Sequence, residues 1–454
     1  MTDSLTLPHP AMTPGGLPGP GLPRLLPGAD AVPVDLRAHL AMHGPLRAAG
    51  GRDGLLREVA AAGLTGRGGA AFPVARKLAA AAEARPAPVV VGNGAESEPA
   101  SSKDRSLLWI APHLVLDGLQ LAAAAAGSRS AVLYVPRNER LHTRLAGAIA
   151  ERAAAGMDAA RVELVTAPDR FLAGQESALV SRLAGRPALP AYRPVPGLPR
   201  LASGRPALVQ NVETLAHLAL IARYGAAWFR ETGTEAEPGS MLATLHLADG
   251  RVSVTEVPLG TSLAGLLGLD GGLGPAGAGA AGPGVSASGP VQAVLVGGYH
   301  GAWLPAAEAA ALPLANAALR PLGAAVGAGV LATLPADRCG LAETARVARY
   351  LALESAGQCG PCFNGLPRIA AAVAHLAGPR PDPRARADLE RWAGLVTGRG
   401  ACHHPDGSAR FIRSALRVFT AEAGLHEQGR CSGTDPRPFL PVPATAPATE
   451  EDWS

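Results

Sequence analysis

Hydrophobic and polar residues in the first half of the chain follow two alternating periods. Apolar positions recur at helical spacing in four segments, which are 51–64, 77–84, 112–127 and 140–156. Short, mostly apolar runs of the kind found in buried strands cover 87–93, 130–136 and 161–167. Strands that alternate with helices form parallel βαβ units, so the pattern predicts an α/β domain over residues 53–238.

The pattern changes after Met241. Short alternating strands around an Asp-Gly turn, a short helix and a return to strand at 291–305 predict a small β-grasp module over 239–310. Within it, the composition of residues 271–290 predicts a flexible loop. From about residue 336 the spacing is helical again, in four segments at 341–357, 366–378, 386–398 and 409–424. These segments predict a small helical bundle within residues 325–430.

Both ends of the chain differ from this core. Residues 1–52 are rich in Pro and Gly and predict a largely unpacked lead-in, and residues 431–454 form a Pro-rich, acidic tail. The N-terminus lacks a basic segment followed by an uninterrupted apolar one, so no secretory signal is expected. Apolar runs such as 121–127 fall far short of the roughly 20 residues that span a bilayer. We expect a protein that is not integral to the membrane.

Composition narrows the class of protein. Hydrophobic residues make up 48% and charged residues 17% of the 454 residues, which is typical of a packed protein of several domains. A net charge of +4 without a basic stripe gives no support to nucleic-acid binding. Five cysteines are too few for a disulfide framework and indicate a reducing, cytoplasmic compartment. Of 41 basic residues only Lys77 and Lys103 are lysines, and both fall in dense motifs.

A glycine-rich segment, "GLTGRGGAAF", covers residues 63–72. It superficially fits the dinucleotide fingerprint, but the preceding segment is helical where that fingerprint needs a strand. Its glycines, at 63, 66, 68 and 69, would still let the backbone approach a flat or phosphorylated ligand. Arg67 and Lys77 beside the loop favour a ligand over a plain helix connector.

Three further segments gather polar side chains. "GNGAESEPASSKDR" follows a buried strand, where ligands of open α/β sheets bind, and contains Asn93, Glu96, Glu98, Lys103, Asp104 and Arg105. Glu176 lies near the start of a predicted helix, as do Asn211 and Glu213 in "QNVETLAHL". Surface ion pairs and helix capping are the ordinary interpretations of such residues.

The cysteines raise a separate question. Cys359 and Cys362 form a C-x-x-C motif in "QCGPC", and Cys402 follows 40 residues later beside His403 and His404. A thioredoxin-like dithiol would need a βαβ context, whereas this motif lies between helices. Three thiols and a histidine could hold zinc, and three thiolates with one more ligand could hold a [4Fe–4S] cluster. Spacing alone does not choose between them.

Together, five ordered motifs between about residues 53 and 420 resemble the NADH- and FMN-binding flavoprotein subunit of respiratory complex I. Related diaphorase subunits occur in NAD-linked hydrogenases and formate dehydrogenases. The matching segments are "GLTGRGGAAFPVARK", "GNGAESEPASSKDR", "GQESALVSRLAG", "QNVETLAHL" and "ESAGQCGPCFNG". The resemblance implies a Rossmann-like FMN/NADH domain, a β-grasp (SLBB-like) domain and a helical domain that carries an iron–sulfur site.

The implied activity is that of an NADH:acceptor oxidoreductase. FMN takes a hydride from NADH and passes single electrons to a [4Fe–4S] cluster and onward to an acceptor protein, such as a ferredoxin or a small iron–sulfur subunit. The implied location is cytoplasmic, peripheral to the inner face of the plasma membrane as part of a complex. The implied cofactor-binding residues are Gly66, Arg67, Gly68, Gly69, Phe72, Lys77, Asn93, Glu96, Glu98, Gly174, Glu176, Asn211 and Thr214. The implied cluster ligands are Cys359, Cys362 and Cys402.

The chain also departs from the family pattern. Ala356 stands where the family has its first cluster cysteine, and Cys339 would lie roughly 25 Å away along a helix. An open cluster site, a three-iron form, a ligand from a partner and an absent cluster are therefore all alternatives. Around the flavin, the departures are Ala71, Ala95, Gln175 and Gln210. Two other functions follow from them: a non-catalytic electron-transfer or assembly subunit, and a zinc-stabilised binding protein.

Overall fold

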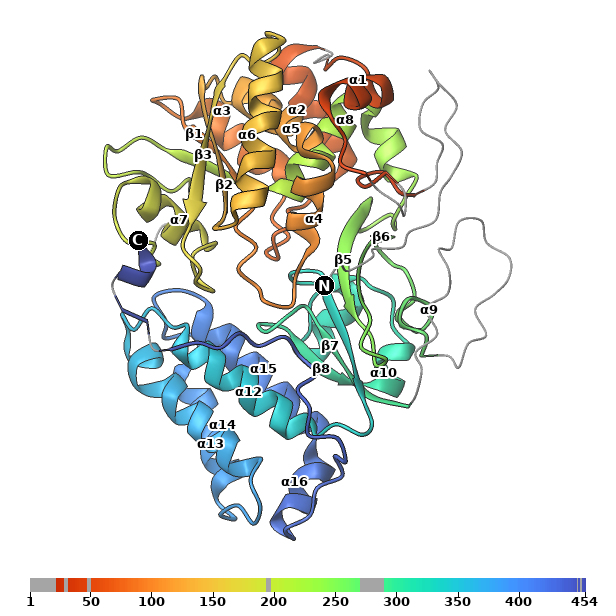
Figure 1. Cartoon of the computed structure of the whole chain (residues 1–454), viewed down its shortest axis with the longest axis vertical. Coiled ribbons are helices and arrows are strands. Elements are labelled where there is room, and N and C mark those ends of the chain that lie inside the picture. The colour runs from red at the N-terminus through yellow and green to blue at the C-terminus, as the bar shows by residue number, and fades with distance from the viewer. Residues whose placement is uncertain are drawn as a thin grey trace.

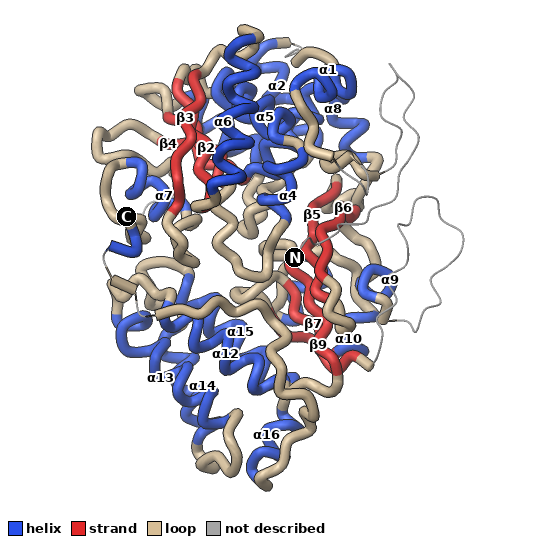
Figure 2. Tube along the Cα trace, in the orientation of Figure 1, coloured by secondary structure: helices blue, strands red, loops and turns tan. Residues whose placement is uncertain are grey.

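The computed structural model describes residues 22–27, 32–46, 50–192, 197–269, 290–446, 448–449 and 451–454. An α/β layer occupies one end of the long axis, and a second sheet and a helical bundle lie side by side at the other end (Figure 1). Figure 2 shows the strands gathered into two separate sheets. This arrangement confirms the predicted fold class.

Four parallel strands form the first sheet, in the order β3-β2-β1-β4. They are β1 (Val89–Asn93), β2 (Ser130–Pro136), β3 (Arg161–Ala167) and β4 (Ala207–Asn211). Three consecutive valines begin β1, and its first four residues are buried. A central strand that is buried on both faces is expected to be this uniformly apolar or small, which is why the sequence revealed it as a short continuous run.

Helices cover both faces of this sheet. They are α2 (Gly51–Ala62), α3 (Val74–Glu83), α4 (Lys103–Ile110), α5 (Pro112–Ala125), α6 (Glu139–Ala154), α7 (Glu176–Leu183) and α8 (Val212–Arg230). Nearly every residue of α5 is buried, because α5 packs between the sheet and its neighbouring helices. A Cβ on Gly118 would lie 1.9 Å from the carbonyl oxygen of Leu215, so α5 and α8 approach each other at a glycine.

The described part of the lead-in is packed, which corrects the expectation of a largely unpacked segment. Leu25 and Leu26 are buried in the first core, and the backbone amides of Arg24 and Leu25 donate to Glu256 at 2.6 and 2.7 Å. Helix α1 (Leu36–His43) places buried His39 2.7 Å from Asp117. A few apolar and capping residues in a Pro-rich background are enough to order it.

The second sheet has five strands in the order β6-β5-β9-β7-β8. They are β5 (Ser240–His246), β6 (Val252–Pro258), β7 (Val291–Val296), β8 (Ala302–Pro305) and β9 (Val330–Pro335), accompanied by the short helices α9 (Leu263–Leu267), α10 (Ala306–Ala310) and α11 (Asn316–Leu319). The central strand β9 comes from beyond the predicted 239–310 module, within the range assigned to the helical domain. Its sequence is short and wholly buried, so periodicity did not distinguish it from a helix. Most of the predicted flexible loop, residues 271–289, lies outside the described residues.

The C-terminal region is helical, as predicted. Its helices are α12 (Gly340–Leu353), α13 (Leu366–Leu376), α14 (Ala385–Val396), α15 (His404–Val418) and α16 (Thr420–Glu427), with a π-helical turn at Pro361–Gly365. The predicted segment 409–424 is divided at Phe419, whose φ and ψ leave the helical region between α15 and α16. Among the described helices none is by itself long and apolar enough to cross a membrane, although the bent pair α4 and α5 passes by length and composition.

The C-terminal tail returns across the molecule to the α/β layer. Figure 1 shows the end of the chain beside α7. There the carbonyl of Trp453 accepts from the amide of Ala188 at 2.7 Å, and Asp452 pairs with Arg170 at 2.8 Å. Arg170 also pairs with Glu354, at the end of α12, at 3.0 Å. One buried guanidinium therefore connects the first domain, the bundle and the tail.

Candidate functional site

The carboxyl ends of β1 and β4 meet where the strand order of the first sheet reverses. From β1 the chain continues outward to β2 and β3 on one side, and β4 returns on the other. Asn93 and Asn211 end these two strands and stand opposite each other in the ladder. Because ligands of open α/β sheets bind outside the carboxyl ends at such a switch point, this edge is the candidate site.

The glycine-rich loop between α2 and α3 packs against this edge. A Cβ on Gly68 would lie 3.2 Å from the Cβ of Asn211, which is tighter than an ordinary contact. The amide of Arg67 donates to the hydroxyl of Thr214 at 2.8 Å and so holds the loop to the start of α8. Gly69 has a φ of +102°, a conformation that favours glycine. The sequence therefore uses glycine where the loop must approach the strand ends.

The side chain of Arg67 points into the protein. Its guanidinium donates to the carbonyls of Ser240 at 3.1 Å and Thr65 at 2.9 Å, and it is buried. Burial lowers the pKa of Arg67, although the nearby Glu213 carboxylate opposes this shift. The guanidinium thus ties the loop to the second sheet, and both the side chain and the backbone amide of Arg67 are engaged within the protein.

Phe72 lies at the exposed end of the same loop. The residue is 48% exposed, and the Arg76 guanidinium lies 5.6 Å from the ring centroid. The carbonyl of Phe72 accepts from the amide of Gly66 at 2.9 Å and closes the loop. The preceding Ala71 has a φ of +50°. The family's glycine would adopt that φ without strain, whereas the methyl of Ala71 disfavours it.

A third segment, residues 174–176, reaches the site from β3. The Asn93 side-chain amide donates to the carbonyl of Gly174 at 2.9 Å, and a Cβ at Gly174 would lie 3.2 Å from the hydroxyl of Ser97. Lys77 pairs with Glu176 at 2.6 Å, and both side chains are partly exposed. Four of the segments singled out in the sequence therefore converge at one edge of the sheet.

Lys103 lies beneath this edge in a buried ionic network. Its ammonium lies 2.7 Å from Asp104 and 2.8 Å from Glu213, and Asn211 donates to Asp104 at 2.7 Å. Burial disfavours the charged form of Lys103, but the two carboxylates outweigh it and raise its pKa. Burial raises the pKa of Asp104 to about 6. Burial also opposes ionisation of Glu213, but Lys103 and His217 lower its pKa to about 2.

The Glu96 carboxylate accepts hydrogen bonds at the N-terminus of α4. It accepts from the backbone amides of Asp104 and Arg105 at 2.8 Å each, at the start of α4, and from the hydroxyl of Ser101 at 2.8 Å. Acidic groups are favoured at this end of a helix dipole. Glu96, which the resemblance assigned to cofactor binding, is held here by the backbone of its own loop.

Glu98 faces the second sheet. It accepts from the amide of Tyr299 at 2.8 Å and from that of Ala100 at 3.3 Å. Gly298 has a φ of +85°, and a Cβ there would lie 2.6 Å from the Glu98 carboxylate, so the turn between β7 and β8 favours glycine at this position. Burial raises the pKa of Glu98 to about 7, although both backbone hydrogen bonds oppose the shift. The Glu98 carboxyl group therefore links the loop after β1 to the second sheet.

The three predicted cluster cysteines lie together at one end of the bundle. Cys359 and Cys362 lie between α12 and α13, and Cys402 lies just before α15. Burial raises the pKa of Cys362, and the nearby thiols of Cys359 and Cys402 raise it further. Ala356, which stands where the family has its first cluster cysteine, packs against the hydrophobic core of the second sheet and the bundle.

Neither adjacent histidine completes this set. The Nδ1 of His404 lies 3.0 Å from His300 and its Nε2 lies 2.8 Å from the carbonyl of Leu351, so both ring nitrogens are engaged. The His403 side chain is 99% exposed and lies 3.5 Å from Asp406. The fourth cluster position is therefore without a histidine ligand in this arrangement.

Sequence reasoning missed a second group of ligand-type side chains. Within the described residues, the group whose ligand atoms all lie within 4.8 Å of one another is Cys339, Glu422, His426 and Cys431. The thiols of Cys359, Cys362 and Cys402 do not meet this distance limit in the described structure. Tetrahedral zinc would require their sulfurs to lie about 3.8 Å from one another. The spacing of Glu422 and His426, one turn apart on α16, was the available sequence signal.

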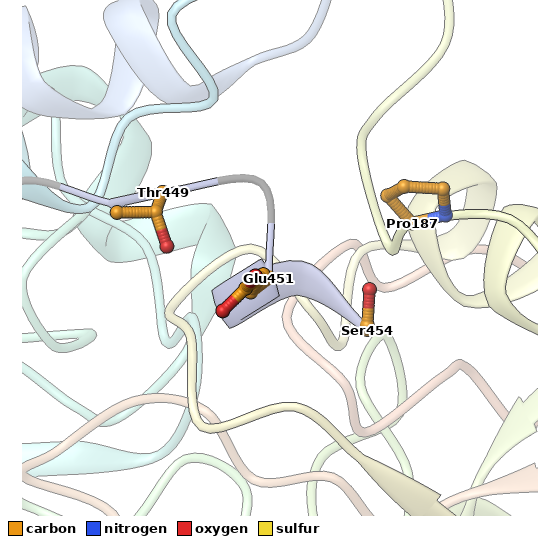
Figure 3. Close-up of a pocket in the computed structure, with 4 residues that line it drawn as sticks. All are labelled: Pro187, Thr449, Glu451 and Ser454. Atoms are coloured by element: carbon orange, nitrogen blue, oxygen red, sulfur yellow. The ribbon is translucent and has the colours of Figure 1, made fainter.

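Figure 3 shows the residues that line a pocket near the end of the chain. Pro187, Thr449, Glu451 and Ser454 line it, and it contains none of the predicted site residues. A smaller cleft lies between the glycine-rich loop and the second sheet, where Gly66, Gly69 and Gly327 are among the lining residues. Of the predicted site residues, Gly66, Arg67 and Gly69 line this smaller cleft.

Comparison with known proteins adds independent findings. Residues 59–220 match the family described as the Nuo51 FMN-binding domain, and residues 342–426 match the NADH-ubiquinone oxidoreductase-F iron-sulfur binding region. The NADH-quinone oxidoreductase F subunit of Streptomyces coelicolor is 29% identical over 87% of this chain and 86% of its own length. The corresponding F subunit of Mycobacterium tuberculosis H37Rv is 30% identical over 86% of this chain and 88% of its own.

Among solved structures, an NAD⁺-reducing [NiFe]-hydrogenase in the H₂-reduced state contains a similar chain. The TM-score is 0.74 at 27% sequence identity, and the match covers 90% of this chain and 68% of the other. The shared region extends over both sheets and the bundle, since it covers nine-tenths of this chain.

Proposed function

The chain belongs to the family of NADH-quinone oxidoreductase F subunits, and we propose that it carries out its redox function through the site at the carboxyl ends of β1 and β4. That function is NADH oxidation with FMN and electron transfer through an iron–sulfur group, which makes the chain an oxidoreductase flavoprotein. The observation that carries the proposal is the convergence of the glycine-rich loop, Asn93, Glu176 and Asn211 at one switch point inside the FMN-binding match.

The residues at this edge suit a flavin mononucleotide. Bare backbone at Gly66, Gly68 and Gly69 can approach a flat ring system or a phosphate, and the amide side chains of Asn93 and Asn211 offer both donors and acceptors. Lys77 supplies a positive charge that is only partly exposed. When bound, FMN supplies hydride acceptance and one-electron release.

We assign the remaining predicted residues by what each side chain can do in this structure. Phe72 offers an exposed aromatic face for a nicotinamide ring. We propose that Glu98 and Glu176 lie near the ribose or nicotinamide of NADH, and Gly174 lets its segment approach Asn93. Glu96, Arg67 and Thr214 position the two loops. The range 53–238 remains our proposal for the FMN/NADH domain, whereas the second sheet extends from β5 to β9, and the helical domain therefore begins after residue 335.

The iron–sulfur region provides three thiol ligands rather than four. Cys359, Cys362 and Cys402 lie together, and Ala356 offers no donor at the fourth position. We propose a cluster held by these three cysteines, whose fourth ligand is not a cysteine of the same loop. Such a site would have an altered potential, because ligand identity and solvent access set cluster potentials.

The chain has protein partners, as a subunit of this class. We propose that its electron acceptor is a ferredoxin or a small iron–sulfur subunit, and that the chain works in the cytoplasm, peripheral to the inner face of the plasma membrane. The substitution at Ala356 favours one alternative, a non-catalytic electron-transfer or assembly subunit on the same scaffold.

An anaerobic absorption spectrum of the purified chain, with iron and flavin analysis before and after NADH addition, tests the proposal. Flavin absorption bleached by NADH, together with bound iron, is the expected result. A chain that holds neither flavin nor iron after reconstitution would leave the assembly alternative in its place. The Ala356→Cys variant adds a matched comparison, because a restored fourth thiolate should raise iron retention and change the cluster signal.

A further inference from the structure

A second cluster of metal-ligand side chains lies at the opposite end of α12 from the cysteine loop. Cys339 caps the start of α12, Glu422 and His426 stand one turn apart on α16, and Cys431 follows the end of α16. Their ligand atoms all lie within 4.8 Å of one another. Since α12 has 14 residues, it separates this group from the cluster loop by roughly 21 Å.

The distances within the group suit one small tetrahedral cation. The Sγ of Cys339 lies 3.6 Å from His426 Nε2 and 3.9 Å from Glu422 Oε1, and the last two atoms are 3.0 Å apart. Zinc bond lengths of about 2.0–2.3 Å in a tetrahedron place ligand atoms about 3.3–3.8 Å apart. A small separation of Glu422 from His426 brings these three atoms close to that geometry, and the Cys431 sulfur lies within 4.8 Å of each of them.

Neighbouring groups hold the ligands in place. The Oε1 of Glu422 accepts from the amide of Ser432 at 2.9 Å, and its Oε2 accepts from the Ser432 hydroxyl. The Cys339 sulfur accepts from the amide of Ala342 at 3.4 Å. Hydrogen bonds of this kind orient metal ligands and contribute to affinity. Cys339, Glu422 and His426 are largely shielded from solvent, and Cys431 closes the exposed side.

This group belongs to neither cofactor site described above. Cys339 and Cys431 both lie outside residues 342–426, which match the iron–sulfur binding region. Their partners are two side chains of α16, remote from Cys359. The thiol and imidazole donors favour zinc over magnesium or calcium, which prefer oxygen ligands.

We propose that Cys339, Glu422, His426 and Cys431 bind a structural Zn²⁺ ion, independently of the flavin and iron–sulfur chemistry. With four protein ligands the site is closed, as structural zinc sites are. It fixes the chain where the tail leaves the bundle: the amides of Thr434 and Asp435 donate to the carbonyl of Asp337 at 2.9 and 3.0 Å. A Cβ on Gly433 would lie 2.7 Å from the Cys339 amide nitrogen, so the tail crosses the start of α12 in direct contact.

Metal analysis of the full chain, loaded with Zn²⁺ and then desalted, tests the proposal in a crossed design. The wild type should retain about one Zn²⁺ per chain. The C339S/C431S variant should lose the zinc and keep the iron of wild type, and C359S/C362S should lose iron and keep the zinc. The fully exposed His403→Ala serves as the matched histidine control and should keep both.

Glu422→Gln provides a second test that applies even if the C339S/C431S variant does not fold. This change keeps the shape of the side chain and removes its charge, and we expect Zn²⁺ affinity measured by chelator competition to fall by about tenfold or more. The proposal is overturned if zinc-loaded wild type retains no zinc, if C339S/C431S and Glu422→Gln retain it unchanged, or if mass spectrometry shows the two thiols joined as a disulfide. Loss of FMN binding alone would leave it standing.

Discussion

Lys103 shows how far a single residue can differ from the ordinary expectation for its type. Lysine is usually exposed, yet Lys103 is buried between two carboxylates, and Asn211 at the candidate site donates to one of them. The other lysine, Lys77, is partly exposed and pairs with Glu176. Both lysines of this Arg-rich chain therefore form ion pairs near the carboxyl ends of β1 and β4.

Replacing Lys103 with Met should leave Asp104 and Glu213 buried without a counter-charge. We expect the free energy of unfolding to fall by about 3–5 kcal/mol, measured by urea unfolding at pH 7. Lys77→Met is the matched control and should cost at most about 1 kcal/mol, because its pair is partly solvated. If both variants lost the same free energy of unfolding, burial of Lys103 would not determine its contribution to stability.

At the scale of elements, two helices of the first domain pack so closely that a glycine is required. The carbonyl of Leu215 on α8 occupies the space of a Cβ at Gly118 on α5. Gly147 on α6 is different, because a Cβ there would meet open space. Close packing therefore requires glycine at position 118, whereas no contact requires it at position 147.

Gly118→Ala and Gly147→Ala should change stability in opposite directions. The first forces α5 and α8 apart, and we expect a loss of about 1–3 kcal/mol or more in thermal or chemical unfolding. The second replaces a flexible residue in an exposed helix and should gain about 0.5–1 kcal/mol. A neutral Gly118→Ala variant would contradict the close packing of α5 on α8.

At the scale of the whole molecule, a few polar side chains connect the domains. Glu98, in the loop that follows β1, accepts a hydrogen bond from Tyr299 in the second sheet's β7–β8 turn. Arg170 pairs with Glu354 of the bundle and with Asp452 of the tail. These contacts join segments that are at least 184 residues apart in sequence and connect the first sheet, the second sheet and the helical bundle.

Stability should depend on pH through Glu98. Its pKa in the folded protein is raised to about 7 from an ordinary 4.5, so its favourable contribution is complete below pH 4.5 and is lost as the pH rises through 7. Glu98→Gln removes this titration and should gain about 2 kcal/mol relative to wild type between pH 5 and pH 8. Paired unfolding curves at the two pH values provide the measurement, and a constant difference would contradict the shift.

Local patterns in the sequence were enough to predict the parallel α/β core, the helical C-terminal region and the family. Alternation and helical spacing depend on neighbours in the chain, and the motifs around Gly68, Asn93 and Asn211 are contiguous. The same patterns failed for the buried strand β9, which lacks a period of its own, and for the lead-in, whose Leu25 and Leu26 join a core made of residues distant in sequence.

Tertiary structure alone decided which of those residues face a ligand and which face the protein. Arg67 and Glu96 lie inside recognisable motifs, but their side chains hold neighbouring backbone. Cys339 and Cys431 are 92 positions apart in sequence, and only the packing of α16 against the start of α12 brings their thiols together. Sequence determines local conformation through short-range periodicity, whereas a site made of distant residues exists only once long-range packing has placed them.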